Sequence, residues 1–88
     1  MDIMHYVYLL KSLKDLGYYI GVTSNLKSRF KEHSTGGSKA TDRRRPFVLV
    51  YYEAYRSKSD AVLREKRLKQ FKNGYRELLK RLTKSACV

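Results

Sequence analysis

The stretch that decides the fold is YYIGVTSNLKSRFKEH, residues 18–33, in which a strand runs into a helix. Tyr18 to Val22 is short and rich in aromatic and β-branched residues, which is typical of a β-strand. Ser24 or Asn25 can then cap a helix, because either side-chain oxygen accepts a hydrogen bond from a free backbone N–H. Apolar residues recur at helical spacing until two glycines at 36–37. The stretch therefore predicts a strand followed at once by a short helix.

Two further strands are predicted around this stretch. Ile3 to Lys11 (IMHYVYLLK) is rich in β-branched and aromatic residues. It lies close enough in sequence to pair antiparallel with Tyr18–Val22 through a turn that ends at Gly17. Phe47 to Tyr55 (FVLVYYEAY) is a near-continuous apolar run, which is typical of a buried central strand. We expect this third strand to join the hairpin.

Two helices are predicted after the third strand. Ser57 or Ser59 opens the first, DAVLREKRLKQFK, and Gly74 separates it from the second, YRELLKRL. Three leucines of the second helix form an apolar patch, which favours core packing over a partner interface: Leu78, Leu79 and Leu82. The predicted order is β-β-α-β-α-α, an α/β fold with a small three-stranded, mainly antiparallel sheet flanked by helices.

Length and composition limit the protein to one small basic domain. The chain has 88 residues, 42% of them hydrophobic, which is enough for a single domain over residues 1–88 with its core at about 3–82. Twenty Lys and Arg stand against eight Asp and Glu, giving a formal charge of +12. A field of this sign favours a polyanion, so nucleic acid is the first candidate partner.

Several other classes of protein do not fit the sequence. The longest apolar run, Tyr6–Leu10, is far below the roughly 20 residues that a membrane span needs. The N-terminus has no pattern typical of a secretory signal, so we expect a cytoplasmic protein, associated with the nucleoid if it is bacterial. One cysteine, Cys87, and two histidines are too few for an internal disulfide or a zinc site.

Two predicted helices carry polar residues at positions that suggest a site. Arg29 and His33 lie four apart and therefore share a face. Their spacing alone favours an ordinary solvated charge for Arg29, with a functional face as the alternative. Glu65 falls within the apolar arc of its helix, where a carboxylate is disfavoured. A bound cation or metal and an ion pair with Lys69 explain that position equally well.

The strands add tyrosines and one glycine to these candidates. Tyr6 and Tyr8 share a strand face, and Tyr19 lies on the predicted partner strand, so two or three phenols converge. Cross-strand aromatic packing is the default interpretation. Gly21 interrupts a strand, which indicates a bulge or the close approach of another group, a phosphate being one option.

The segment between the first helix and the third strand is a basic loop. TGGSKATDRRRP, residues 35–46, has no apolar period. We favour phosphate contacts over simple solubility for its cations, because the arginines directly precede a buried strand and cannot move far from it. The candidate nucleic-acid contacts are Lys39, Arg43, Arg44 and Arg45, together with Tyr6 and Gly21.

Three motifs together resemble the GIY-YIG nuclease superfamily. They are YVYLL at 6–10, YYIGVTSNLKSRFKEH at 18–33 and LREKRLK at 63–69. The resemblance runs from about Tyr6 to Phe71 and is strongest to small stand-alone proteins that consist of the nuclease domain alone. The N-terminal nuclease domain found in the ABC excinuclease is also similar. The resemblance to the superfamily rests on the order and spacing of the residues. Tyr8 is 11 residues before Tyr19, Arg29 is 10 residues after Tyr19, and His33 follows four residues later.

The resemblance implies a catalytic role for each matching residue. The tyrosine matching Tyr19 deprotonates or positions the attacking water, and the tyrosine matching Tyr8 lies beside it. The arginine matching Arg29 binds phosphate, and the residue matching His33 hydrogen-bonds in the site. The glutamate matching Glu65 holds one divalent metal, Mg²⁺ or Mn²⁺. One carboxylate is enough to seat Mg²⁺, which keeps several of its waters.

The implied function is a metal-dependent DNA endonuclease, specific for a DNA structure and acting in repair or recombination. Val22 follows the second motif where some active relatives have lysine. A second class therefore stays open, a non-catalytic DNA- or RNA-binding module that retains the nuclease fold. The chain is also short, so a protein partner that supplies specificity is an expectation.

Overall fold

The computed structural model describes residues 3–70 and 72–87, and it has the element order that the sequence predicts. To that order it adds a short 3₁₀ helix in the basic loop. The elements are β1 (His5–Ser12), β2 (Tyr18–Thr23), α1 (Leu26–Thr35), η1 (Asp42–Arg44), β3 (Phe47–Tyr55), α2 (Lys58–Gln70) and α3 (Lys72–Arg81). The predicted α/β fold class is therefore confirmed.

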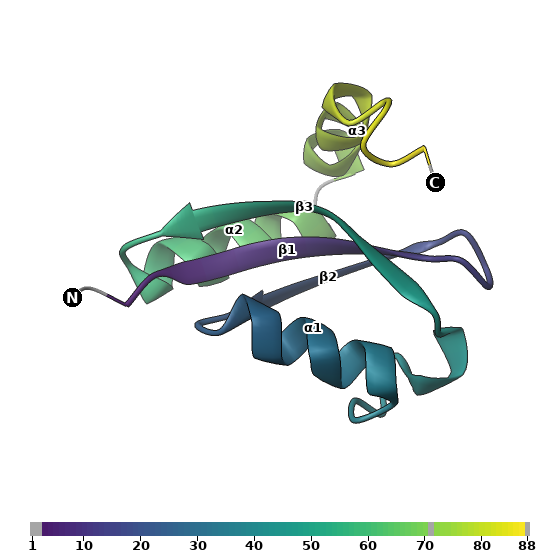
Figure 1. Ribbon diagram of the computed structural model, residues 1–88. Coiled ribbons are helices and arrows are strands. Elements are labelled where there is room, and N and C mark those ends of the chain that lie inside the picture. The colour runs from purple at the N-terminus through teal and green to yellow at the C-terminus, as the bar shows by residue number, and fades with distance from the viewer. Residues whose placement is uncertain (1–2, 71, 88) are drawn as a thin grey trace.

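The sheet is antiparallel throughout and has the order β2-β1-β3 (Figure 1). The central strand is β1, in which Val7 to Leu10 are all buried. Our expectation that Phe47–Tyr55 is the central strand was wrong, because β3 lies at an edge and its Tyr52 is 53% exposed. Continuity of the apolar run had suggested burial on both faces.

A bulge in β3 explains why an edge strand shows a continuous apolar run. Leu9 pairs with Tyr51 while Leu10 pairs with Leu49, so Val50 is an extra residue in β3. Side chains alternate between the two faces of a sheet, and an inserted residue reverses that alternation. Phe47 and Leu49 consequently pack with the α1 side, whereas residues 50 and 51 pack with the α2 side.

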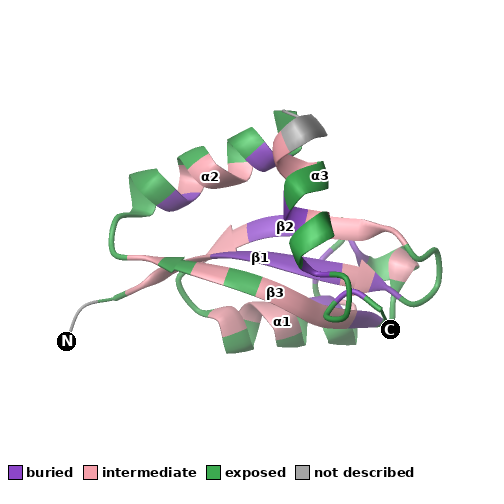
Figure 2. Ribbon diagram, turned by 90° about the horizontal axis from the view of Figure 1, so that it is seen from above, coloured by how far each residue is buried: buried purple, intermediate pink, exposed green. Residues whose placement is uncertain are grey.

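The helices cover both faces of the sheet and create two cores. Alternate β1 residues serve the two sides: Val7 and Leu9 pack toward α2 and α3, Tyr8 and Leu10 toward α1. In Figure 1, α1 lies below the sheet, and Figure 2 shows the buried central strand between α1 and α2. The core against α1 is the smaller one, and it contains Tyr8 and Tyr19 of the candidate site.

Caps define α1 as the sequence predicts. The Asn25 side chain accepts a hydrogen bond from the backbone N–H of Ser28 at 3.1 Å. Gly36 ends the helix in the left-handed region with φ of 85°, which glycine adopts without strain. These two caps fix where α1 starts and stops relative to β2.

The boundary between the last two helices differs from our prediction. α2 ends at Gln70 and α3 begins at Lys72, so Gly74 lies inside α3 instead of separating the helices. Residue 71, within the predicted first helix, lies outside the described residues. Leu78 and Leu82 are buried in the core and Leu79 packs against it, which confirms their structural role. No helix in the described ranges is long and apolar enough to cross a membrane.

Gly74→Ala should stabilise the protein by about 0.5–1 kcal/mol, because alanine reduces the conformational freedom of the unfolded chain and favours helix. A Cβ added at this position meets nothing within 4 Å. Urea denaturation of the two proteins measures the change. The matched variant Gly36→Ala should destabilise, because its φ is 85° and its Cβ would lie 2.7 Å from an Asp42 oxygen. Equal effects of the two substitutions would contradict both assignments.

Candidate active site

The centre of the site is the Tyr8 side chain, which lies across Gly21 on the neighbouring strand. Tyr8 pairs with Gly21 in the β1–β2 register. A Cβ at residue 21 would overlap the Tyr8 hydroxyl oxygen, so any side chain there would displace the phenol. The close approach predicted from this glycine is thus the protein's own phenol. A phosphate contact at Gly21 remains a prediction.

His33 connects Tyr8 to the basic loop through both ring nitrogens. Its Nε2 lies 2.8 Å from the Tyr8 hydroxyl, and its Nδ1 lies 2.7 Å from the hydroxyl of Thr41. The side chains of all three residues are buried, His33 and Thr41 with 0% exposure. α1, β1 and the loop therefore meet at one imidazole.

Donor and acceptor chemistry favours one direction for this hydrogen-bond chain. The Thr41 hydroxyl donates to the Ser38 carbonyl at 3.5 Å and can then accept from His33 Nδ1–H. Nε2 of the neutral imidazole is consequently an acceptor, and the Tyr8 hydroxyl donates to it.

Burial keeps both members of the Tyr8–His33 pair neutral. Burial raises the pKa of Tyr8, although its hydrogen bond with Arg29 opposes this. Burial and the positive charge of Arg29 lower the pKa of His33. The loss of hydration disfavours the charged form of each group. The pair is therefore a fixed neutral hydrogen bond at pH 7.

Tyr19 and Arg29 complete the side of the site formed by β2 and α1. The Tyr19 ring centroid lies 5.0 Å from that of His33 and 6.4 Å from that of Tyr8. The Arg29 guanidinium also pairs with Glu32 at 2.6 Å and is partly exposed. Arg29 is thus more than the solvated helix charge that its spacing favours, because its charge acts on the pKa of Tyr8 and of His33.

Glu65 approaches this group from α2. Its side chain is 18% exposed and pairs with Lys69 at 3.7 Å, so the ion pair allowed by the sequence is present. Its negative charge also acts on the Tyr8 phenol, so the carboxylate belongs to the same region. Of the two interpretations of Glu65, the ion pair is observed, and the loose 3.7 Å contact leaves the metal interpretation open.

A second acidic residue fixes α2 against the sheet next to Glu65. Arg64 donates to both oxygens of the Glu53 carboxylate, at 2.9 Å for the shortest contact to each. Tyr51 donates to the same carboxylate at 2.7 Å, and Tyr55 donates to it as well. Burial and these bonds raise the pKa of Tyr51 and of Tyr55 to about 12. Because Arg64 precedes Glu65 directly, this network sets the rotation of α2 at the site.

The carboxylate set fits one Mg²⁺ and does not fit a metal cluster. Within residues 3–70 and 72–87, no three His, Cys, Asp or Glu side chains gather as a metal-binding group. Mg²⁺ is commonly held by one or two carboxylates while it keeps several waters. Glu65 alone, at the rim of the site, meets that requirement.

The predicted nucleic-acid contacts other than Gly21 lie in two separate places. Tyr6 packs edge-on against Tyr52, with ring centroids 5.8 Å apart, and is not part of the Tyr8 group. In the loop, the Arg44 guanidinium is bound to Asp15 at 2.7 Å and lies over the Phe47 ring. Two other loop cations line a shallow cleft beside Gly36: Lys39 and Arg43. Arg45 pairs with Asp42 at 3.0 Å.

Thr41, which accepts from His33, is a site residue that was not predicted from the sequence. Threonine in a polar loop is common and has no spacing relation to the motifs, so no local signal identified it. A loop of this composition is expected on the surface. Its burial arises only because the loop folds back over α1.

Comparison with known proteins identifies the family of this chain. Residues 4–77 match the GIY-YIG catalytic domain, and the chain belongs to that family. Membership places it in a nuclease superfamily whose domains bind nucleic acid. The resemblance stated from the sequence is therefore confirmed.

Its relatives include small UPF0213 proteins from bacteria and archaea. One from Staphylococcus haemolyticus is 48% identical over 68 residues, which cover 76% of this chain and 82% of that protein. One from Halobacterium salinarum is 40% identical over 77 residues, covering 86% and 99%. The solution NMR structure of a UPF0213 protein from Bacillus halodurans has a TM-score of 0.56 at 39% identity. The match covers 90% of this chain and 84% of that chain. None of these names states an activity.

Stability should fall as the pH drops below about 6.5, because His33 takes up a proton more readily in the unfolded chain than in the buried site. The depressed folded pKa makes the contribution of His33 full above about pH 6.5. That contribution is lost as the pH falls toward the folded pKa. Urea midpoints between about pH 7.5 and 5 measure the loss. His33→Gln should flatten this dependence and His5→Gln should not; an unchanged slope in His33→Gln would rule out the buried neutral imidazole.

Proposed function

We propose that the protein is a divalent-metal-dependent endonuclease that hydrolyses phosphodiester bonds in DNA. The observation that carries the proposal is that Tyr19 packs on the buried, hydrogen-bonded Tyr8–His33 pair while the charge of Arg29 acts on the same phenol, so that four polar side chains from three separate elements gather there. A structural core would not need an arginine and an imidazole on one phenol. Structure-specific cleavage in DNA repair or recombination is the biological role that we infer from the family.

Each side chain has a role that its surroundings support. Arg29 is partly exposed and always charged, so it binds the scissile phosphate and stabilises the charge that develops on its oxygens. Tyr19 orders or deprotonates the attacking water from the edge strand. The neutral Tyr8–His33 hydrogen bond ties α1, which carries Arg29, to β1, the strand that pairs with the Tyr19 strand. Thr41 keeps the imidazole in the tautomer that accepts from Tyr8.

Glu65 is the residue that would hold the metal. A bound Mg²⁺ or Mn²⁺ polarises the phosphate and stabilises a leaving oxygen. Lys69, which is 51% exposed, can leave the carboxylate at little cost because an exposed ion pair is worth little. Glu53 and Arg64 keep the Glu65 backbone in place while Lys69 moves.

Tyr19→Phe and Glu65→Gln should each abolish metal-dependent cleavage while leaving the fold intact. For Tyr19→Phe the reason is the loss of acid–base assistance, which lowers a rate by about 10²- to 10⁴-fold. For Glu65→Gln the reason is the loss of the proposed metal ligand. The assay incubates the protein with labelled single-stranded, duplex, flapped and branched DNA, with Mg²⁺ or a chelator. Glu77→Gln, at an exposed glutamate on α3, is the matched control and should cleave like the wild type.

Two results would change the proposed function. Tight, salt-sensitive binding without cleavage of any substrate would favour a non-catalytic nucleic-acid binder that retains the fold. Cleavage that persists in chelator, or in Glu65→Gln, would remove the metal from the proposal. Circular dichroism of each variant separates these results from unfolding.

Arg43→Ala should reduce the salt dependence of DNA binding by about one unit of slope, as expected when one phosphate contact is lost. Its neighbour Arg44 is bound within the chain to Asp15 and Phe47. Arg44→Ala should therefore lower thermal stability more than it changes the slope. Binding titrations at several salt concentrations, together with thermal unfolding, test this division. Identical slopes for wild type and Arg43→Ala would remove the loop from the DNA interface.

A further inference from the structure

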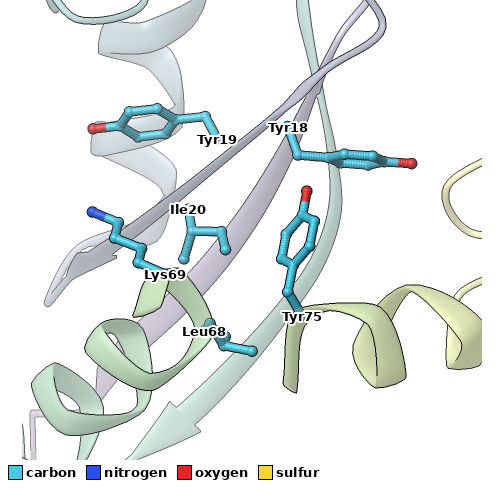
Figure 3. Close-up of a pocket in the computed structure, with 6 residues that line it drawn as sticks. All are labelled: Tyr18, Tyr19, Ile20, Leu68, Lys69 and Tyr75. Carbon is cyan, nitrogen blue, oxygen red and sulfur yellow. The ribbon is translucent and has the colours of Figure 1, made fainter. Parts of the chain in front are cut away.

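A pocket with three aromatic walls opens on the β2 edge of the sheet, next to the candidate active site. Its volume is about 340 Å³, within the range of small-ligand pockets. The six residues that line it come from β2, α2 and α3: Tyr18, Tyr19, Ile20, Leu68, Lys69 and Tyr75. Figure 3 shows Tyr19 and Lys69 on one side and Tyr18 and Tyr75 on the other.

The pocket combines an apolar floor with aromatic side walls. Ile20 and Leu68 are buried members of the larger core and lie between the two sides (Figure 3). Tyr18 and Tyr75 meet edge to face, with ring centroids 6.1 Å apart and an angle of 76° between their planes. Such walls suit a flat ring with polar edges, because the ring faces contact apolar surface while the edges and the phenols stay accessible to water.

Two residues join the pocket to the proposed catalytic group. Tyr19 lines the pocket and also packs 5.0 Å from the His33 ring. Lys69 lines the pocket and pairs with Glu65. A strand whose phosphate lies at Tyr19 and Arg29 would therefore bring its adjacent nucleotide to the pocket mouth.

We propose that this pocket binds an unstacked nucleobase of the substrate strand, next to the phosphate at Tyr19. The proposal rests on the proposed function and adds the form of the substrate: a base that enters the pocket has left its duplex stack. Aromatic side chains bind single-stranded bases by stacking, with little dependence on sequence. Lys69 supplies a cation for the neighbouring backbone phosphate.

Charge and position favour a nucleobase over other flat groups. The chain carries a formal charge of +12, and the pocket shares Tyr19 with the group of residues proposed to bind and cleave the phosphate. A nucleotide satisfies both features at once, with its base on the tyrosines and its phosphate on the cations. The substrate that fits these features is a nucleic-acid strand with an unpaired base next to the cleaved phosphate.

The test compares two strands of the same length and charge, one with bases and one without. The probes are a fluorescently labelled thymidine dodecamer and a fully abasic deoxyribose-phosphate dodecamer, titrated by anisotropy in chelator so that no cleavage occurs. The wild type should prefer the strand with bases. Tyr75→Leu should weaken binding of that strand by roughly 5- to 150-fold, the effect of losing one stacked base, and leave the abasic strand unchanged.

Two matched variants separate stacking from packing. Tyr75→Phe keeps the ring and should bind like the wild type. Tyr52→Ala removes an exposed tyrosine outside the pocket and should keep the preference for bases. Leucine at 75 preserves the apolar cover of the core that Tyr75 contacts, and thermal unfolding verifies the fold. Equal weakening of both strands in Tyr75→Leu, no weakening of either, or no preference in the wild type would overturn the proposal.

The titration of base preference and the cleavage assay test the two proposals separately. Cleavage that needs Tyr19 and Glu65, without any effect of Tyr75 on base preference, removes the pocket from the proposal and leaves the nuclease. A preference for bases that needs Tyr75, without cleavage of any substrate, supports the nucleobase site and rejects the nuclease.

Discussion

The candidate site depends on one buried hydrogen bond, between the Tyr8 hydroxyl and the imidazole of His33. A polar pair inside a small core is stable only if each remaining donor and acceptor is also satisfied. Thr41 satisfies the free ring nitrogen of His33, and the charge of Arg29 acts on the phenol at the other end. The bond therefore constrains β1, α1 and the basic loop together. Gly21 is part of the same constraint, because only an absent side chain leaves room for the phenol.

The two faces of the central strand β1 have different roles, one in the stability of the fold and one in the candidate site. On the side of α2 and α3, residues of β1 belong to the larger apolar core. On the side of α1, its residues belong to a smaller core built around an aromatic and polar group. The alternation of side chains along a strand makes this separation possible within eight residues. Among the proposed catalytic residues, Glu65 comes from the other side, and the Glu53–Arg64 network fixes the helix that carries it.

Local sequence patterns predicted most of the fold and only part of the site. Caps and periodicity located α1 and the hairpin, because those signals act within a few residues of where they are read. The position of β3 was missed because a bulge at Val50 depends on its pairing partner. The buried contact of Thr41 was missed for the same reason, since the loop that carries it is placed by tertiary structure. Arg29 and His33 were predicted as site residues because their spacing from Tyr19 resembles that of the family. Their helical spacing alone favoured an ordinary charged helix.

The bulge at Val50 also makes β3 a member of both cores. Its first half contributes Phe47 and Leu49 to the core beneath α1, and its second half contributes Tyr51 and Glu53 to the side of α2. Removing that one residue would turn the second half over, moving the Glu53 carboxylate away from Arg64. One inserted residue in an edge strand thus allows the first half of β3 to pack toward α1 and the second half to pack toward α2.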